Sequence, residues 1–207
     1  MGKIDFGLAF SRGWDAFAKN IGILLGGYCL TIVISMTIVL GPAIYAGFFF
    51  MVLKILRGQK AEINDLFVGF SDFGRFFVGG LLIFGLSMCG LLCCCVGIIV
   101  VNGLTIFLLM HMVDKGKSAE EALQDCWANF KIDWLMLILF AFVVNLVAQA
   151  GVYALYFGIL LSAPFAVCVT GAAYLDVFGN GLEPMPAQPI LIAEAVEKDA
   201  GEMDATK

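Results

Sequence analysis

The sequence predicts an all-helical integral membrane protein with about six transmembrane helices, arranged as three pseudo-repeated hairpins that each follow an amphipathic interfacial helix. Three observations predict this fold: an apolar composition, three long uncharged blocks, and basic residues that lie only outside those blocks. Of the 207 residues, 61% are hydrophobic and 14% are charged, and the mean hydropathy is +0.97. Soluble domains have a charged fraction of about 25%, so this composition excludes a soluble domain and indicates a bilayer.

The uncharged blocks are too long for one membrane crossing each. They cover residues 20–53, 76–113 and 134–175, which are 34, 38 and 42 residues long. As straight helices they would measure roughly 50 to 63 Å, whereas the hydrocarbon core is about 30 Å thick. Two crossings per block need about 17 to 21 residues each, so we expect breaks at Leu40–Ala43, Cys95–Ile98 and Leu161–Phe165.

The basic residues predict the orientation of these hairpins. All twelve lysines and arginines lie outside the blocks, and the expected turns within the blocks contain none. By the positive-inside rule, both termini and the two gaps between blocks are cytoplasmic. The first apolar block begins only after about twenty residues and lacks a small-residue cleavage site, so no cleavable signal peptide is predicted. The expected location is the bacterial cytoplasmic (inner) membrane, crossed several times.

Residues 179–207 form an acidic segment with a different composition. They contain six acids, two lysines and three of the five prolines. Such a composition does not build a core, so the segment is predicted to be a disordered cytoplasmic tail. Its apolar stretch Pro189–Val196 is either part of that solvated tail or a short binding motif.

Each uncharged block follows an amphipathic stretch with large apolar residues at positions i, i+4 and i+7. These residues are Phe10, Trp14 and Phe17, then Leu66, Phe70 and Phe73, then Leu123, Trp127 and Phe130. The spacing places each trio on one helical face, and aromatic residues of interfacial helices lie at the headgroup boundary. The nine residues are therefore predicted membrane-interface anchors. The alternative is that these helices extend the following spans and pack against a neighbour.

A capping-box pattern supports the start of the third amphipathic helix. Ser118 is followed three residues later by Glu121, the spacing at which the two residues cap a helix reciprocally. The repeat unit is thus an amphipathic helix followed by a hairpin. The units cover about residues 4–57, 61–114 and 118–178, within a single transmembrane domain of residues 1–178.

Three segments carry a family resemblance. Phe10–Leu25, Ile55–Phe70 (ILRGQKAEINDLFVGF) and Val113–Trp134 resemble bacterial multi-pass membrane proteins of unknown function, which are related to the membrane domain attached to some glycerophosphodiester phosphodiesterases. The resemblance covers roughly residues 5–178. The chain departs from it at Cys126, where similar proteins often have serine, and at Val96–Gly97, where they often have Pro-Gly. It implies a helical membrane fold and no catalytic residue, because the soluble phosphodiesterase domain is absent.

Seven cysteines include the consecutive run Cys93–Cys95, with Cys89 one turn earlier. Three consecutive side chains on a helix point about 100° apart, so they cannot converge on one metal ion. Free cysteine also behaves as a small hydrophobe. The run is therefore predicted to be packing, with a redox pair or a metal site as the alternatives.

The remaining polar candidates lie within or beside the predicted spans. His111 is the only histidine, and we expect an interfacial anchor that hydrogen-bonds Asp114, with a ligand or a proton relay as the alternative. Asn102, Asn145 and Gln149 are the predicted intramembrane polar residues. Buried amides usually join neighbouring helices, and a polar pathway is the alternative.

The predicted function is that of a non-enzymatic membrane protein, a structural or accessory subunit that organises lipid or a partner membrane complex. The alternative is a transporter or channel for lipid or a small uncharged solute, along Asn102, Asn145 and Gln149. No catalytic, cofactor-binding or metal residue is assigned, and no cofactor is expected. The expected partners are membrane lipids, with a membrane protein or a second copy of the chain as further candidates. Nucleic acid is not expected, because the basic residues are scattered.

Overall fold

The computed structural model describes residues 6–37, 39–92, 101–102, 104–153 and 157–178, and every regular element in this part of the chain is helical. The all-helical fold class is thus confirmed for these residues. The elements are α1 (Phe6–Lys19), α2 (Ile21–Ser35), α3 (Gly41–Leu56), the 3₁₀ helix η1 (Ile63–Phe67), α4 (Val68–Ser71), α5 (Phe73–Leu92), α7 (Leu108–Lys115), α8 (Ala119–Tyr153) and α9 (Phe157–Phe178).

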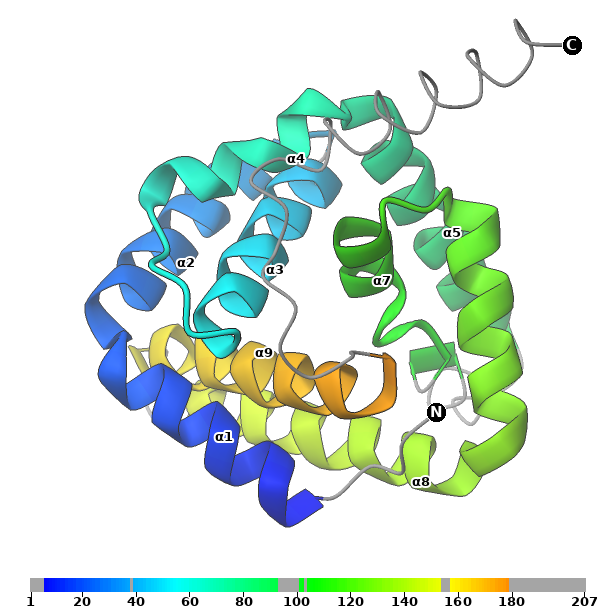
Figure 1. Ribbon diagram of the computed structural model, residues 1–207. Coiled ribbons are helices and arrows are strands. Elements are labelled where there is room, and N and C mark those ends of the chain that lie inside the picture. Colours follow the sequence, from blue (N-terminus) through cyan, green and yellow to red (C-terminus); the bar gives the residue numbers. More distant parts are fainter. Residues whose placement is uncertain (1–5, 38, 93–100, 103, 154–156, 179–207) are drawn as a thin grey trace, which may run out of the picture.

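Helix α3 lies at the centre of the fold (Figure 1), and eleven of its sixteen residues are buried. It packs against α2, α7 and α9, while α9 packs along both α1 and α8. The centre is apolar around α3: Phe48, Phe50 and Met51 are at most 1% exposed. Helices α3 and α9 therefore hold the other elements together.

Two glycines bring α3 against the short helices η1 and α4. A Cβ atom at Gly47 of α3 would overlap the carbonyl oxygen of Leu66, and one at Gly69 of α4 would overlap the carbonyl oxygen of Ala43. The two backbones are in contact, so a side chain at either position would force them apart. Small residues commonly permit such close approach between helices in membrane proteins.

Two helices in the described ranges are long and apolar enough to cross a membrane: Phe73–Gly90 of α5 and Leu160–Phe178 of α9. Two bent pairs raise the number to four if each pair is one span. Helices α1 and α2 meet at 90°, and the two halves of α8, Ala119–Ile132 and Trp134–Gln149, meet at 108°. The described part of the chain is thus helical and has two to four candidate membrane spans.

The three expected breaks have different outcomes. The first is confirmed, because α3 begins at Gly41 with Pro42 in its first turn. Cys95–Ile98 lies outside the described residues. The break at Leu161–Phe165 is wrong, since α9 continues through Pro164. Proline removes one backbone hydrogen bond, but Phe165 packs edge-on against Trp14 and Phe17 of α1 and fixes this part of α9 in place.

The single amphipathic helix expected across Leu66–Phe73 is also wrong. The segment is divided among η1, α4 and the start of α5, and Asp72 between the last two has the non-helical angles φ −116°, ψ 45°. Glu62 and Asp65 form a capping box that starts η1 instead, and Asp65 binds Lys54 at 2.9 Å. Local capping and the contact with α3 therefore override the hydrophobic spacing.

The capping box at the start of α8 is confirmed. The backbone N–H of Ser118 donates to the Glu121 carboxylate at 3.3 Å, and the N–H of Glu121 donates to the Ser118 hydroxyl at 3.4 Å. Gly116, just before it, has a left-handed φ of 66° and ends α7. The turn and the cap together fix where α8 begins.

Candidate functional site

A buried polar network joins the ends of α3, α7, α8 and α9. Arg57 follows the last residue of α3 and forms an ion pair with Asp114 of α7, with Nη1 and Oδ1 2.6 Å apart. Their side chains are only 7% and 3% exposed. Burying two charges is costly unless they are paired with good geometry, so this contact fixes α3 relative to α7.

The network continues from Asp114 to the surface through two aromatic side chains. The Tyr174 hydroxyl of α9 donates to Oδ2 of Asp114 at 2.9 Å, and Nδ1 of His111 lies 3.1 Å from that hydroxyl oxygen. Nε2 of His111 lies 2.8 Å from Oδ2 of Asp125 in α8, which also accepts a hydrogen bond from Lys117 at 2.6 Å. One continuous chain of close polar contacts thus joins all four helices.

Counting protons shows what this chain of contacts requires. Tyr174 has one hydroxyl proton, so if it donates to Asp114, Nδ1 of His111 must donate to the hydroxyl oxygen. A neutral ring then has no proton on Nε2, which faces the Asp125 carboxylate. All of the contacts are hydrogen bonds at once only when the ring carries both protons.

The contact at Asp125 determines what the ring lacks. The hydrogen bond from Lys117 lowers the pKa of Asp125, which keeps that group a carboxylate. When the proton of a neutral His111 ring is on Nδ1, the bare Nε2 faces that carboxylate at 2.8 Å. The network can therefore accept one further proton, at Nε2 of His111.

The sequence indicated only part of this site. His111 was expected to bind Asp114 directly, but the Tyr174 hydroxyl lies between them and binds both. Arg57 and Asp125 were not singled out, because the residues that meet here are far apart in sequence. The only available signal was that polar groups flank the ends of uncharged blocks.

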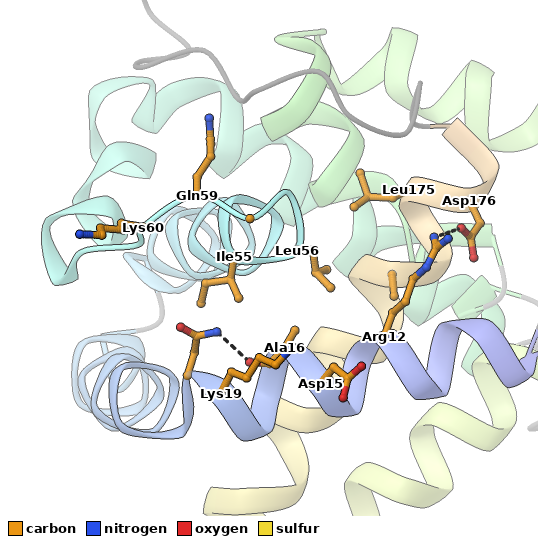
Figure 2. Close-up of a pocket in the computed structure, with 13 residues that line it drawn as sticks. Arg12, Asp15, Ala16, Lys19, Ile55, Leu56, Gln59, Lys60, Leu175 and Asp176 are labelled. Atoms are coloured by element: carbon orange, nitrogen blue, oxygen red, sulfur yellow. Dashed lines mark hydrogen bonds and ion pairs between the residues drawn. The ribbon is translucent and has the colours of Figure 1, made fainter.

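A second polar feature is an open cleft between α1, the segment after α3, and the last turns of α9 (Figure 2), with a volume of about 960 Å³. Its charged residues are Arg12, Asp15, Lys19, Lys60 and Asp176. Arg12 reaches from α1 to Asp176 of α9, with Nη1 and Oδ1 2.6 Å apart. In the described part of the chain, no ion pair involves Lys19 or Lys60.

The inner wall of the cleft is apolar. Ile55 and Leu56 point from the end of α3 toward α1 (Figure 2), and Leu175 of α9 lines the same space. Gly58, with a left-handed φ of 75°, turns the chain out of α3 at the cleft's edge. The cleft therefore combines an apolar wall with a charged rim, an arrangement common in binding sites.

The nine predicted interface anchors fall into three groups. Trp14 and Trp127 are 57% and 47% exposed. Phe17, Leu66 and Phe130 are buried against other parts of the protein. The half-buried members are Phe10, Phe70, Phe73 and Leu123. Contact with a membrane stays a prediction for these residues, and Trp14 and Trp127 are the two that present most surface for it.

The three predicted intramembrane amides, Asn102, Asn145 and Gln149, are exposed on the surface of the protein. Asn145 donates to the carbonyl of Ala141 in its own helix at 2.8 Å. A polar link between helices does exist nearby, because the Ser162 hydroxyl of α9 donates to the Ala148 carbonyl of α8 at 2.9 Å. No feature of the sequence pattern marks that serine.

The cysteines are distributed between the surface and the interior. Cys93–Cys95 lie outside the described residues, Cys89 is exposed, and Cys126 and Cys168 are buried. Within the described ranges, no group of histidine, cysteine and acidic side chains is placed to hold a metal ion. Cys126 packs in the same apolar cluster as Phe130 and Tyr174.

Comparison of the chain with known proteins finds no matching family model, no matching curated protein and no matching solved structure. The resemblance to bacterial multi-pass membrane proteins therefore stays an expectation from the sequence. Function is inferred from the contacts and exposure of the described residues.

Proposed function

We propose that the chain is a multi-pass protein of the bacterial inner membrane, with six spans in three hairpins and both termini in the cytoplasm. In this proposal it is not an enzyme but a structural or accessory subunit that organises lipid or a partner membrane complex. The observation that carries the proposal is a feature common to helices α1 and α8. Both α1 and α8 pack on α9, and each has a tryptophan, Trp14 or Trp127, whose side chain is about half exposed.

The surroundings of the two tryptophans support this role. Trp14 packs edge-on against Phe165 and is still 57% exposed. Trp127 is stacked on Phe130, and the Lys131 ammonium lies 5.5 Å from its ring centroid. A half-exposed tryptophan suits the headgroup level, where its ring can meet acyl chains, and the Lys131 ammonium beside Trp127 can meet phosphate there.

Two apolar stripes support contact with acyl chains. On α5, Val78, Leu81, Phe84 and Met88 are 44% to 61% exposed. On the second half of α8, Leu135, Leu139, Phe142 and Leu146 are 48% to 65% exposed. Each set follows helical spacing along one face. Soluble monomers rarely expose continuous apolar surface of this kind, whereas helices that face lipid do.

Quenching of tryptophan fluorescence by brominated lipids tests the membrane part of the proposal. The chain has three tryptophans, so variants that retain only Trp14, only Trp127 or only Trp134 report separate positions. In bilayers with bromine at different depths, we expect Trp14 and Trp127 to be quenched most strongly by bromine near the headgroups. Quenching of both by aqueous iodide but by no brominated lipid would remove the lipid-contact proposal.

Gentle extraction from the native membrane, followed by native mass spectrometry, tests the accessory role. We expect a defined lipid or protein to co-purify, and its amount to fall several-fold in the double variant Trp14→Ala/Trp127→Ala. The exposed Trp134, changed to alanine, is the matched control. If the double variant retained every lipid and protein contact of the unmodified chain, the proposed organising role of α1 and α8 would be abandoned.

A further inference from the structure

We propose that the acidic segment of residues 189–204 binds in the cleft between α1, the segment after α3, and α9 of the same chain. This inference goes beyond the proposed function, because it concerns an internal docking site rather than lipid or a partner. Residues 179–207 lie outside the described residues, so only their sequence is used. The cleft itself is built entirely from described residues.

The charge of the cleft fits an acidic occupant. Its rim contains three cations and two carboxylates, in a chain whose net charge is −5. Arg12 is paired with Asp176, but Lys19 and Lys60 are exposed and form no ion pair in the described part of the chain. Residues 179–207 contain six acids and two lysines. The acidic segment is therefore opposite in charge to the two ammonium groups of the cleft.

The acidic segment has an apolar stretch next to its acids, just as the cleft has an apolar wall next to its lysines. Ile190–Ile192 is apolar and is followed by Glu194, Glu197 and Asp199. In the cleft, an apolar wall with Ile55 and Leu56 lies beside the cationic rim. An extended peptide can place Ile190–Ile192 on that wall while its acids reach Lys19 and Lys60. Binding would then gain both from burial of apolar surface and from charge pairing.

The connection to α9 makes this contact easy to form. Helix α9 ends at Phe178, only two residues after Asp176, which lines the cleft. The ten residues from 179 to 188 span at most about 33 to 36 Å when extended, so residue 189 can reach any part of the cleft. A tethered segment of this length has an effective concentration of about millimolar, so weak pairing is sufficient.

Site-specific photocrosslinking in the full-length protein tests the docking. A benzophenone amino acid replaces Asp15, which is exposed and lines the cleft, and in a control variant replaces Glu120, an equally exposed acid on α8 outside the cleft. After irradiation and proteolysis, we expect crosslinks from position 15 to peptides within residues 189–204, and several-fold fewer from position 120. Crosslinks independent of protein concentration identify contacts within one chain.

Charge exchange tests the recognition. The double variant Lys19→Glu/Lys60→Glu should lower the crosslink yield at position 15 several-fold, and adding Glu194→Lys/Glu197→Lys should restore it. Equal yields from positions 15 and 120 would overturn the proposal. Crosslinks from position 15 to lipid or to a second copy in place of residues 189–204 would also overturn it, and would assign the cleft to that other occupant.

Discussion

The buried network and the open cleft both include residues from the ends of α3 and α9. Their charged groups differ, because those at the centre of the network are buried and those of the cleft are open to solvent. At the end of α3, Arg57 enters the network, while Lys60, three residues later, lines the cleft. On α9, Tyr174 belongs to the network, and Asp176 belongs to the cleft. The Arg57–Asp114 pair of the network is nearly sealed from water, whereas the cleft is open.

This difference in exposure indicates that the buried charges stabilise the fold, whereas the exposed charges are available for binding. The Asp114 side chain is 3% exposed and binds both Arg57 and Tyr174, so removing either partner leaves the buried carboxylate with fewer compensating contacts. Lys60 is exposed and is stabilised by water, so its removal costs the fold little. Charge on the open side is available to a ligand because the fold does not need it.

Loss of the Asp114 carboxylate should give the largest effect. The variant Asp114→Ala removes the group that neutralises buried Arg57, and breaking such a pair costs about 3 to 5 kcal/mol of the free energy of unfolding. The double variant Arg57→Met/Asp114→Leu replaces both charges by apolar groups and should be clearly more stable than Asp114→Ala. Denaturant titration in mild detergent measures both, and equal losses would contradict a structural ion pair.

Loss of the Tyr174 hydroxyl should have an intermediate effect. The variant Tyr174→Phe keeps the ring but leaves Asp114 with one hydrogen bond fewer, which should cost about 1 to 3 kcal/mol of unfolding free energy. Tyr45→Phe is the matched control, because in the described residues no hydrogen bond to its hydroxyl is found. Indistinguishable unfolding of the two variants would show that the network does not depend on Tyr174.

The smallest effects are expected in the cleft. Lys60→Ala should change the unfolding free energy by no more than about 0.5 kcal/mol, since the side chain is exposed and unpaired in the described ranges. Arg12→Ala should cost about 0 to 1 kcal/mol, because its guanidinium is 55% exposed and its pair with Asp176 is screened. Losses as large as that of Asp114→Ala would remove the distinction between the two regions.

The sequence predicted the parts of the fold that depend on local rules. The all-helical class followed from composition, the start of α3 from the Gly41–Pro42 pair, and the start of α8 from Ser118 and Glu121. It failed where tertiary contacts override local preference. Pro164 stays inside α9 because Phe165 is packed against α1, and Leu66 and Phe70 fall in different elements because η1 packs against α3.

The site was less accessible to sequence reasoning. Asp114 and Tyr174 are separated by 60 residues, and only the packing of α7 against α8 and α9 brings them together. The histidine was noticed because it is unique, but its partners depend on that packing. The exposure of the predicted anchors could not be predicted from the sequence either. Phe17 and Trp14 belong to the same i, i+4, i+7 pattern, but Phe17 is buried and Trp14 is exposed.

The proposed membrane topology is the central claim. Residues 189–204 can bind in the cleft only if this segment and the cleft lie on the same side of the membrane. The direct measurement is labelling of single cysteines by a membrane-impermeant reagent, in a background without the seven native cysteines. Exposed Thr37→Cys, three residues before the expected outer turn at Leu40–Ala43, should be labelled in cells with a permeabilised outer membrane, and exposed Lys115→Cys only after lysis. Labelling of position 115 but not 37 in intact cells would reverse the orientation, and equal labelling of both in a soluble fraction would contradict a membrane protein.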